Sequence, residues 1–363
     1  MTCDPPVGSG GMEGRALAYT RALVRSGVHV EVAALAPHQE MSVEPYQGTT
    51  LTRLSSSILQ LPRTFGALVR MISRSSLDSI FILSGGSTAA GLLVLGFSRL
   101  TGRKSGIFFY GRDILQARQQ TSGRISLMLS ILLAGRVATN SRYTAGLLPL
   151  GPRSPLAIIY PGVDARIAEG PSFDQSHQQS RRILFVGRLV RRKGGDLLLT
   201  AFSLLRPTFA DLRLDIVGDG PEMGNLRTQA DELGLGDAVT FHGALYGRSL
   251  WARYAEASIF VMPSRQSKVD AEGFGTVFLE AGAFGVPSVG TRTGGIPEAV
   301  IDGVTGTLVR SEDVEGLRAA IQGLLADPSE MGRMGKNARQ RASGLSWEAS
   351  TTEVLCLFES DVA

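Results

Sequence analysis

Short apolar runs alternate with longer helical patterns along most of this chain, and this alternation constrains the fold more than any other feature. Val28–Leu35 and the run ILFVG that begins at Ile183 are two of the apolar runs. Further runs lie at Gly106–Tyr110, Leu212–Val217, Val239–His242, Ile259–Met262 and Ser288–Gly290. Parallel strands need a long crossover between them, which is usually a helix. The pattern therefore predicts an α/β fold with parallel sheets.

The length of the chain and one polar segment predict two domains. The 363 residues suit two domains of ordinary size. The segment 162–182 is polar and has no periodicity, which is typical of a linker. We therefore expect an N-terminal domain over residues 1–165 and a C-terminal domain over residues 166–346. Residues 347–363 hold a final helical pattern.

Composition indicates a globular protein in a reducing compartment. Hydrophobic residues make up 43% of the chain and charged residues 19%, which excludes intrinsic disorder. Cys3 and Cys356 are the only cysteines, so no disulfide framework is required. The first residues do not form a basic segment followed by an apolar core, so we expect no secretory signal. These features favour a cytoplasmic protein.

One uncharged stretch, Ile80–Ser98, is long enough to span a bilayer if it is helical throughout. Serine, glycine and threonine at positions 84–88 divide it. We therefore expect a short strand, Ile80–Leu83, followed by a helix of small residues. A later apolar segment, Ile125–Leu133, predicts a mostly buried helix.

Charge differs between the two halves of the chain. Residues 1–165 hold 16 Lys and Arg against 8 Asp and Glu, a net +8, whereas residues 166–363 hold 21 against 25, a net −4. A basic half attracts anionic lipid, nucleic acid or a polyanionic acceptor. The alternative is an ordinary soluble face that uses arginine. The sequence leaves both interpretations open.

The run EGFGTVFLEA, which begins at Glu272, places two carboxylates around a glycine pair that opens a helix. Gly273 and Gly275 allow a sharp turn and a close approach of the backbone to a ligand. The predicted helix Thr276–Phe284 begins with N–H groups that attract phosphate. Glu280, one turn into this helix, suits a ribose diol, and Glu272 suits the hydroxyls of a second sugar. The run predicts a nucleotide-sugar site.

These residues resemble the E-x7-E motif of retaining glycosyltransferases of the GT-B fold, especially the family four group. FVGRLVRRKGGD, VGDGP, MPSR and GGIPEAV follow the family's order in the C-terminal half. PPVGSGGME, YGRD and NSRYT give a thinner likeness in the N-terminal half. The resemblance implies two Rossmann-like domains whose parallel sheets face each other across a cleft. It also implies that the final helix returns to the N-terminal domain.

Arg188 and Lys193 lie five positions apart just beyond the strand that begins at Ile183. In the family the matching pair binds the diphosphate of the donor. An arginine fork and a lysine point charge suit that role. The alternative is a solvated basic turn. We expect Arg191 and Arg192 to be surface residues.

In the N-terminal half, YGRD occupies the place where many relatives have His-Gly-x-Asp, whose histidine lies near the transferred sugar. Tyr110 replaces that histidine, and a phenol forms hydrogen bonds but does not titrate near neutral pH. Asp113 matches the motif and suits the orientation of a hydroxyl. An aspartate that opens a helix is equally often a cap.

The candidate site follows from the motifs and the resemblance together. The catalytic candidates are Arg188, Lys193, Glu272, Asp113 and Tyr110. The donor-binding candidates are Gly10, Gly11, Gly187, Gly218, Gly273, Phe274, Gly275, Thr276 and Glu280. No Asp-x-Asp pair and no His/Cys cluster is present in the sequence, so we expect no metal and no cofactor besides the nucleotide-sugar co-substrate.

The glycine loop of the N-terminal half begins four residues from Met1. Family members begin with a strand that leads into this loop, and in the usual order that strand is central in its sheet. The first strand of the N-terminal domain is therefore expected to be missing, which leaves a gap inside the sheet. A start site placed too far downstream and a compromised first domain are the two interpretations.

By resemblance, the reaction moves a hexose from a GDP- or UDP-linked donor with retention of configuration. The segment SRQSKVDAEGFG resembles users of GDP-mannose. We expect a glycan or lipid-linked acceptor of the cell envelope. Arg63, Arg70 and Arg74 motivate a peripheral contact with the anionic inner face of the membrane. We expect no nucleic-acid partner, and the sequence does not predict the oligomeric state. The alternative function is a nucleotide-sugar-binding protein without transferase activity.

Overall fold

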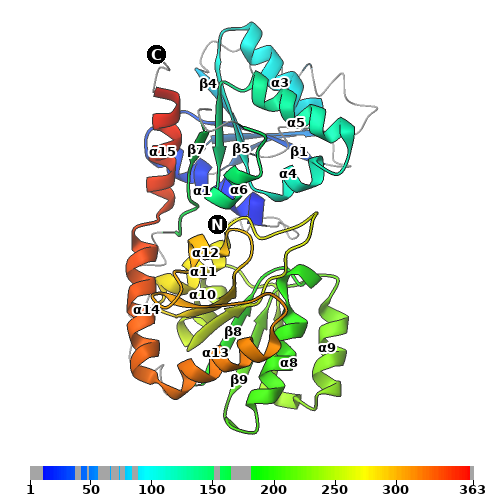
Figure 1. The fold of residues 1–363 in the computed structure, drawn as a ribbon. Coiled ribbons are helices and arrows are strands. Elements are labelled where there is room, and N and C mark those ends of the chain that lie inside the picture. Colours follow the sequence, from blue (N-terminus) through cyan, green and yellow to red (C-terminus); the bar gives the residue numbers. More distant parts are fainter. Residues whose placement is uncertain are drawn as a thin grey trace. The chain divides into compact units, whose positions relative to one another are not determined.

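The computed structural model describes residues 11–36, 42–46, 49–55, 66, 73, 78–83, 89–150, 156–164 and 181–359. They divide into two compact units (Figure 1). The C-unit holds the described residues of 161–346, and the N-unit holds those of 5–160 and 347–363. The last helix of the chain thus belongs to the unit built from its first half.

A single parallel sheet of six strands forms the centre of the C-unit. Its strands are β8 (Arg182–Val186), β9 (Arg213–Val217), β10 (Val239–Gly243), β11 (Ile259–Met262), β12 (Ser288–Thr291) and β13 (Gly306–Val309). The spatial order is β10-β9-β8-β11-β12-β13. This is the strand order 3-2-1-4-5-6 of Rossmann sheets that bind dinucleotides.

Helices connect these strands and bury them. The helices are α8 (Gly195–Leu205), α9 (Met223–Glu232), α10 (Gly247–Glu256), α11 (Thr276–Ala283), α12 (Ile296–Ala299), α13 (Val314–Ala326) and α14 (Pro328–Ser343). Two short 3₁₀ turns lie at Arg191–Lys193 and Gly236–Ala238. The α8 helix packs against α13, and α11 packs against α14. All four residues of β11 are buried, which explains why this strand reads as a continuous apolar run.

The order of the C-unit strands reverses between β8 and β11, which are neighbours at the centre of the sheet. The chain leaves β8 toward β9 on one side and leaves β11 toward β12 on the other. At such a switch point the two loops diverge and leave a crevice at the carboxyl ends of the strands. The loops that follow β8 and β11 therefore meet where open α/β sheets bind ligands.

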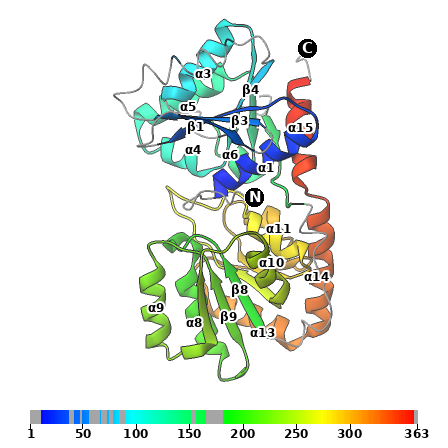
Figure 2. The ribbon, with the colours of Figure 1, turned by 180° about the vertical axis from the view of Figure 1, so that it is seen from behind.

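The N-unit contains a parallel sheet of four strands in the order β4-β5-β6-β7. These strands are β4 (Ser79–Ile82), β5 (Lys104–Phe109), β6 (Arg136–Thr139) and β7 (Leu156–Ile158). Its helices are α1 (Gly11–Arg25), α3 (Ala89–Leu100), α4 (Arg112–Ala117), α5 (Thr121–Leu133), α6 (Arg142–Gly146) and α15 (Trp347–Glu359). The α1 and α15 helices lie side by side (Figure 2), and the centroids of the Tyr19 and Trp347 rings are 5.2 Å apart.

Three further strands of the N-unit form a sheet of their own. They are β1 (Glu31–Ala36), β2 (Ser42–Tyr46) and β3 (Thr49–Ser55), in the order β1-β3-β2. Within the described strands, none of these three pairs with β4. The strand expected to be missing would precede residue 11 and lies outside the described residues. The N-unit strands that are described thus form two sheets rather than one.

Two expectations about apolar segments have different outcomes. The stretch Ile80–Ser98 is divided between β4 and α3, as its serines and glycines predict. In the described ranges, no helix has both the length and the apolar character needed to cross a bilayer. The prediction that Ile125–Leu133 is mostly buried is wrong, because only one face of α5 is covered and apolar side chains on its other face are exposed.

Some expectations fall on residues outside the described ranges. They concern the helical pattern that carries Arg63, Arg70 and Arg74, and Gly10 in the first glycine loop. Most of the expected linker lies there too. Gly11 is described and is the first residue of α1.

Candidate functional site

Two loops meet at the switch point of the C-unit sheet. Residues 187–194 follow β8 and contain the turn Arg191–Lys193, and residues 263–275 follow β11. The backbone N–H of Arg265 donates to the carbonyl oxygen of Arg192 at 2.7 Å. We call residues 187–194 the basic loop and residues 263–275 the acidic loop. The sheet topology and this backbone contact hold them together.

Lys193 and Glu272 form the centre of the site. Lys193 Nζ donates to Glu272 Oε2 at 2.5 Å, and Arg192 Nη1 donates to the same oxygen at 2.7 Å. Lys193 is 9% exposed and Glu272 is 8% exposed. Burial raises the pKa of Glu272, but the charges and hydrogen bonds of Lys193 and Arg192 lower it to about 2. Glu272 is therefore ionised at neutral pH.

Arg192 lies between two carboxylates, so the prediction of a surface residue is wrong for this arginine. Its Nε is 3.1 Å from Asp270 Oδ2, and its Nη1 contacts Glu272. The Arg192 side chain is 20% exposed. Burial lowers its pKa, but the neighbouring carboxylates, Glu272 first, raise it overall. Arg191 is exposed, as expected. The sequence gives no signal for Arg192, because its partner Glu272 is 80 positions away.

Arg188 and Lys193 differ in their surroundings, although the motif places them together. Arg188 is exposed, and no ion pair fixes its guanidinium within the part of the chain that the structure describes. Gly187, which precedes it, borders the lysine, because a Cβ at Gly187 would lie 3.6 Å from Lys193 Cε. Lys193 is thus fixed by Glu272, whereas Arg188, like Arg191, is a cation of this loop that faces solvent.

Arg265 joins several segments around the site, and its role was not predicted. Its Nη1 and Nη2 form a bidentate pair with the two oxygens of Asp196, both at 2.7 Å. Its Nη1 also donates to the carbonyl oxygen of Arg191 at 3.0 Å, and its Nε lies 3.1 Å from Glu312 Oε1. The hydrogen bonds that Arg265 donates to Asp196 raise the pKa of Arg265, burial lowers it in part, and the charges of Asp196 and Glu312 raise it further. The available signal was the MPSR motif directly after a strand.

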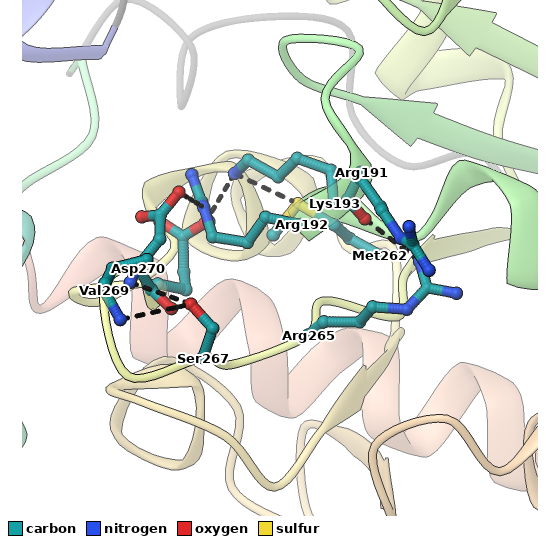
Figure 3. Close-up of polar contacts among 9 residues, drawn as sticks. Arg191, Arg192, Lys193, Met262, Arg265, Ser267, Val269 and Asp270 are labelled. Carbon is teal, nitrogen blue, oxygen red and sulfur yellow. Dashed lines mark hydrogen bonds and ion pairs between the residues drawn. The ribbon is translucent and has the colours of Figure 1, made fainter.

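A local turn presents Asp270 to the basic loop (Figure 3). The backbone N–H of Ser267 donates to the carbonyl oxygen of Asp270 at 2.8 Å. Ser267 Oγ accepts from the N–H of Asp270 at 3.0 Å and from the N–H of Val269 at 3.3 Å. The acidic loop is therefore fixed by Arg265 near its start and by Arg192 near its end.

Glycines of the GGIPEAV motif support the backbone of Glu272. The N–H of Gly295 donates to the Glu272 carbonyl oxygen at 2.9 Å. A Cβ at Gly294 would lie 2.2 Å from that oxygen, and one at Gly295 would lie 2.1 Å from the carbonyl oxygen of Gly273. Gly294 also has a φ of +56°, which side chains rarely adopt. This motif therefore acts by close backbone packing.

The α11 helix begins as the sequence predicts. Gly275 has a φ of +91°, and a Cβ there would lie 2.7 Å from the ring of Phe278. Thr276 is the first residue of the helix and is half-buried. Phe274 is fully buried, which places its side chain in the core of the C-unit. The glycine lets the acidic loop turn directly into the helix.

Glu280 has a partner that sequence reasoning missed. The hydroxyl of Tyr254, on α10, donates to Glu280 Oε2 at 2.7 Å. Tyr254 is fully buried, and burial, together with the charge of Glu280, raises its pKa well above the ordinary value. The tyrosine therefore stays protonated and orients the half-buried carboxylate of Glu280.

Gly218 follows β9 and packs against the basic loop. Its N–H donates to the carbonyl oxygen of Gly243 at 2.8 Å. A Cβ at Gly218 would lie 1.9 Å from the carbonyl oxygen of Gly187. The loops after β8, β9 and β10 are therefore packed backbone to backbone, and this packing leaves no room for a side chain at Gly218.

The N-unit candidates are held by local contacts. Tyr110 is 8% exposed, and its ring stacks on Phe108 with centroids 4.8 Å apart. The Asp113 carboxylate accepts from the N–H of Ile114 at 3.0 Å and from the N–H of Tyr110 at 3.2 Å. Burial raises the pKa of Asp113, although these hydrogen bonds lower it in part. The N-cap residue of α4 is Gly111, and Asp113 is the second residue of the helix, so Asp113 is not its N-cap. Its carboxylate binds neighbouring backbone N–H groups at the helix start.

The C-unit site combines fixed cations, a buried ionised carboxylate and the start of α11 at one edge of the sheet. Such an arrangement suits a ligand that carries both phosphates and hydroxyls. In the described parts of the chain, no three His, Cys, Asp or Glu side chains are grouped so that they could hold a metal ion.

Comparisons with known proteins agree with this geometry. Residues 172–341 match the family described as glycosyl transferases group 1. A GDP-mannose-dependent alpha-(1-6)-phosphatidylinositol monomannoside mannosyltransferase of Mycolicibacterium smegmatis is 32% identical over 366 residues, covering 94% of this chain and 92% of the relative.

Solved structures share the fold. Anabaena Alr3699/HepE in complex with UDP and glucose has a TM-score of 0.78 and 20% identity, covering 99% of this chain and 98% of that one. Sucrose-phosphate synthase from Thermosynechococcus elongatus has a TM-score of 0.77 and 24% identity, covering 97% and 93%. The predictions of the family and of two Rossmann-like domains are confirmed. The chain belongs to the glycosyl transferases group 1 family and is a glycosyltransferase with the GT-B fold.

Proposed function

We propose that this glycosyltransferase moves mannose from GDP-mannose to a hydroxyl of a glycan or lipid-linked acceptor, with retention of configuration and without a metal ion. The observation that carries the proposal is the 2.5 Å contact between Lys193 and Glu272 at the switch point of the sheet. The related mannosyltransferase of Mycolicibacterium smegmatis, whose name states dependence on GDP-mannose, supports the choice of donor.

The cations of the basic loop suit a departing diphosphate. As the glycosidic bond breaks, negative charge develops on the phosphate, and fixed cations stabilise that charge. Arg188 faces solvent, and Lys193 is held in place by Glu272. Arg192 neutralises part of the Glu272 charge, so Lys193 retains positive potential toward a phosphate. Two cations in one loop supply the stabilisation that a metal ion provides in other enzymes.

The two glutamates suit the sugars of the donor. Glu280, oriented by Tyr254, is placed one turn into α11 and suits the ribose hydroxyls. Glu272 is ionised and accepts hydrogen bonds, which suits a hydroxyl of the transferred hexose. A carboxylate already bonded to two cations is a weak nucleophile. We therefore assign the proton of the acceptor hydroxyl to the departing phosphate oxygen, a front-face path that retains configuration.

For Tyr110 and Asp113 we propose a supporting part. The stacking of Tyr110 on Phe108 and the hydrogen bonds that Asp113 accepts from backbone N–H groups fix the backbone of residues 110–113. We place the reaction in the cytoplasm, because the chain has only two cysteines.

The test begins with a thermal-shift panel of GDP, UDP, ADP and the corresponding sugar nucleotides. We expect GDP and GDP-mannose to raise the melting temperature most. Donor turnover is then followed with initial rates, in EDTA and in magnesium, and the anomeric configuration of the product is determined by NMR. A loss of turnover in EDTA overturns metal independence, and an inverted product overturns retention.

A variant pair tests the ribose contact. Glu280→Ala should weaken GDP binding by about 1.5–3 kcal/mol, the range for hydrogen bonds to charged groups. Glu232→Ala is the matched control, because Glu232 is exposed on α9. Equal GDP affinity in both variants overturns the role of Glu280.

A further inference from the structure

The outer face of α5 carries an exposed apolar stripe. Ile125, Met128, Leu129 and Leu132 recur at the spacing of one helix face and are 56%, 42%, 43% and 65% exposed. The opposite face, with Leu127 and Ser130, is buried in the N-unit. The α5 helix is thus apolar on both its buried and its exposed face. Helices that are apolar on all sides are usually covered on all sides.

The neighbouring helix extends the exposed apolar surface. The α3 and α5 helices pack against each other (Figures 1 and 2). On α3, Leu93 is 44% exposed and Leu100 is 88% exposed. Arg99 on α3 and Arg124 on α5 are also exposed. Apolar and basic side chains therefore share these two helices.

The segment of the sequence that carries the stripe is basic. Residues 89–136 contain seven basic residues and a single acidic one, Asp113. The basic residues are Arg99, Arg103, Lys104, Arg112, Arg118, Arg124 and Arg136. Asp113 is half-buried, and its carboxylate accepts from the backbone N–H groups of Tyr110 and Ile114. The net charge of the first half of the chain therefore comes mainly from the segment that carries the stripe.

We propose that the outer face of α5, together with the exposed side chains of α3, docks onto the surface of an anionic phospholipid bilayer. Leu, Ile and Met side chains enter the boundary between headgroups and acyl chains, and neighbouring arginines bind anionic headgroups. The proposal rests on the proposed function in one respect, since it would bring the enzyme to a lipid-linked acceptor.

Other partners fit this surface less well. In a two-fold dimer the same patch faces itself, so Arg99 and Arg124 of one copy would approach like charges of the other. Nucleic acid offers phosphates for the arginines but no apolar counterpart for four aliphatic side chains along one helix. An anionic bilayer complements both the charge and the apolar stripe.

The test is co-sedimentation of the full chain with vesicles of phosphatidylcholine alone or mixed with phosphatidylglycerol. We expect binding to the mixed vesicles at low salt and weaker binding at high salt. Ile125→Ser with Leu132→Ser should lower the partition coefficient roughly tenfold, because two exposed apolar side chains are lost. Arg99→Gln with Arg124→Gln should lower the partition coefficient roughly thirtyfold at low salt, because each arginine near an anionic surface contributes separately to binding.

The matched control is Leu204→Ser with Leu233→Ser, because these C-unit leucines are 44% and 37% exposed. It should bind vesicles like the unchanged chain. The inference is overturned if the unchanged chain does not bind mixed vesicles, if the stripe variant binds equally well, or if that variant instead loses a dimer seen by light scattering. Each variant is also checked for its melting temperature and for stabilisation by GDP. Vesicle binding requires no sugar transfer, so a chain that transfers mannose but ignores vesicles overturns this inference alone.

Discussion

The C-unit and the N-unit both contain a parallel sheet whose strands are joined by helices, but they hold their candidate site residues in different ways. In the C-unit, Lys193 contacts a carboxylate 79 positions away, and Arg265 contacts Asp196, 69 positions away. In the N-unit, Asp113 bonds to backbone groups no more than three positions away. The C-unit site depends on the sheet order that brings its loops together, whereas the Asp113 contacts depend on one helix start.

This difference separates function from local folding. The position of a residue that contacts a distant loop changes when either loop changes. Its loss leaves a buried partner unpaired. A residue that binds only neighbouring backbone groups contributes mainly to its own segment. Substitutions in the two units should therefore differ in the balance between lost turnover and lost stability.

The largest effect is expected for Lys193→Met, which keeps much of the side-chain volume and removes the charge. Donor turnover should fall about 10²–10³-fold, the usual loss when one stabiliser of developing charge is removed. The free energy of unfolding should fall by about 3–5 kcal/mol, because Glu272 becomes a buried charge without its nearest cation. Initial rates and denaturant unfolding measure the two effects.

The double variant Lys193→Met with Glu272→Gln separates the two effects. It should recover stability, because the buried charge is gone, but it should not recover turnover. If turnover returns with stability, Lys193 has only a structural role, and the contrast between the units disappears.

The second prediction concerns the stability of the C-unit in acid. The pKa of Glu272 is about 2 in the folded chain and 4.5 in its ordinary state. A depressed pKa gives stabilisation that is complete above about pH 4.5 and is lost as the pH falls toward 2. The shift corresponds to on the order of 3 kcal/mol. The difference in stability between the unchanged chain and Glu272→Gln should therefore shrink in this window.

The two tryptophans allow each unit to be followed separately. Trp251 lies on α10 of the C-unit, and Trp347 lies on α15 of the N-unit. Trp347→Phe leaves Trp251 as the reporter of the C-unit, and the Glu272 comparison is made in that background. A stability difference that stays constant from pH 6 to pH 2 contradicts the ion pair.

Much of the C-unit was predictable, because its strands are buried apolar runs that end at glycine motifs. Ile259–Met262 matches β11 to the residue, and Glu272 and Lys193 both lie at the switch point. The strand β13 was missed, since GTLV is only four residues long and two of them are glycine and threonine. Arg192 was assigned to the surface, because periodicity in one loop contains no information about carboxylates in another.

The N-unit was less predictable for a related reason. The pattern of α5 correctly predicts a helix, but apolar composition does not reveal whether another surface covers it. YGRD carries a family motif, yet the contacts of Tyr110 and Asp113 depend on packing against Phe108 and on the start of α4. Motifs identify which residues to examine, and packing decides what they contact.

The third prediction tests the backbone support of the C-unit site. Gly294→Ala places a Cβ 2.2 Å from the Glu272 carbonyl oxygen at a φ of +56°. We expect a loss of about 2–3 kcal/mol in unfolding free energy from steric overlap and backbone strain together. Gly303→Ala is the matched control, since its φ is +71° and nothing lies within 4 Å of the added Cβ.

The control variant should lose only about 1 kcal/mol, the strain of a positive φ. Gly294→Ala should also weaken GDP binding, because the acidic loop has to move to make room for the added Cβ. Gly303→Ala should leave GDP binding unchanged. Equal losses of stability and equal GDP affinity in the two variants would mean that close packing at Gly294 does not position the loop. Denaturant unfolding and GDP titration measure both quantities.

The smallest effect is expected for Asp113→Asn in the N-unit. An amide oxygen can still accept from the N–H of Tyr110 or Ile114, so the stability at pH 7 should change by less than about 1 kcal/mol. Burial raises the pKa of Asp113 above 3.8, so the folded chain binds its proton more tightly than the unfolded chain. The unchanged chain should therefore lose stability relative to Asp113→Asn as the pH rises through the interval above 3.8, opposite in sign to Glu272.

Trp251→Phe leaves Trp347 to report this transition in the N-unit. Donor turnover of Asp113→Asn should stay within about threefold of the unchanged chain, because Asp113 binds neighbouring backbone groups rather than the reacting atoms. A fall of about 10²-fold with unchanged stability would assign Asp113 to catalysis. That result would also show that purely local contacts can hold a site residue. The two units would then differ only in the sequence distance between each site residue and the groups it contacts.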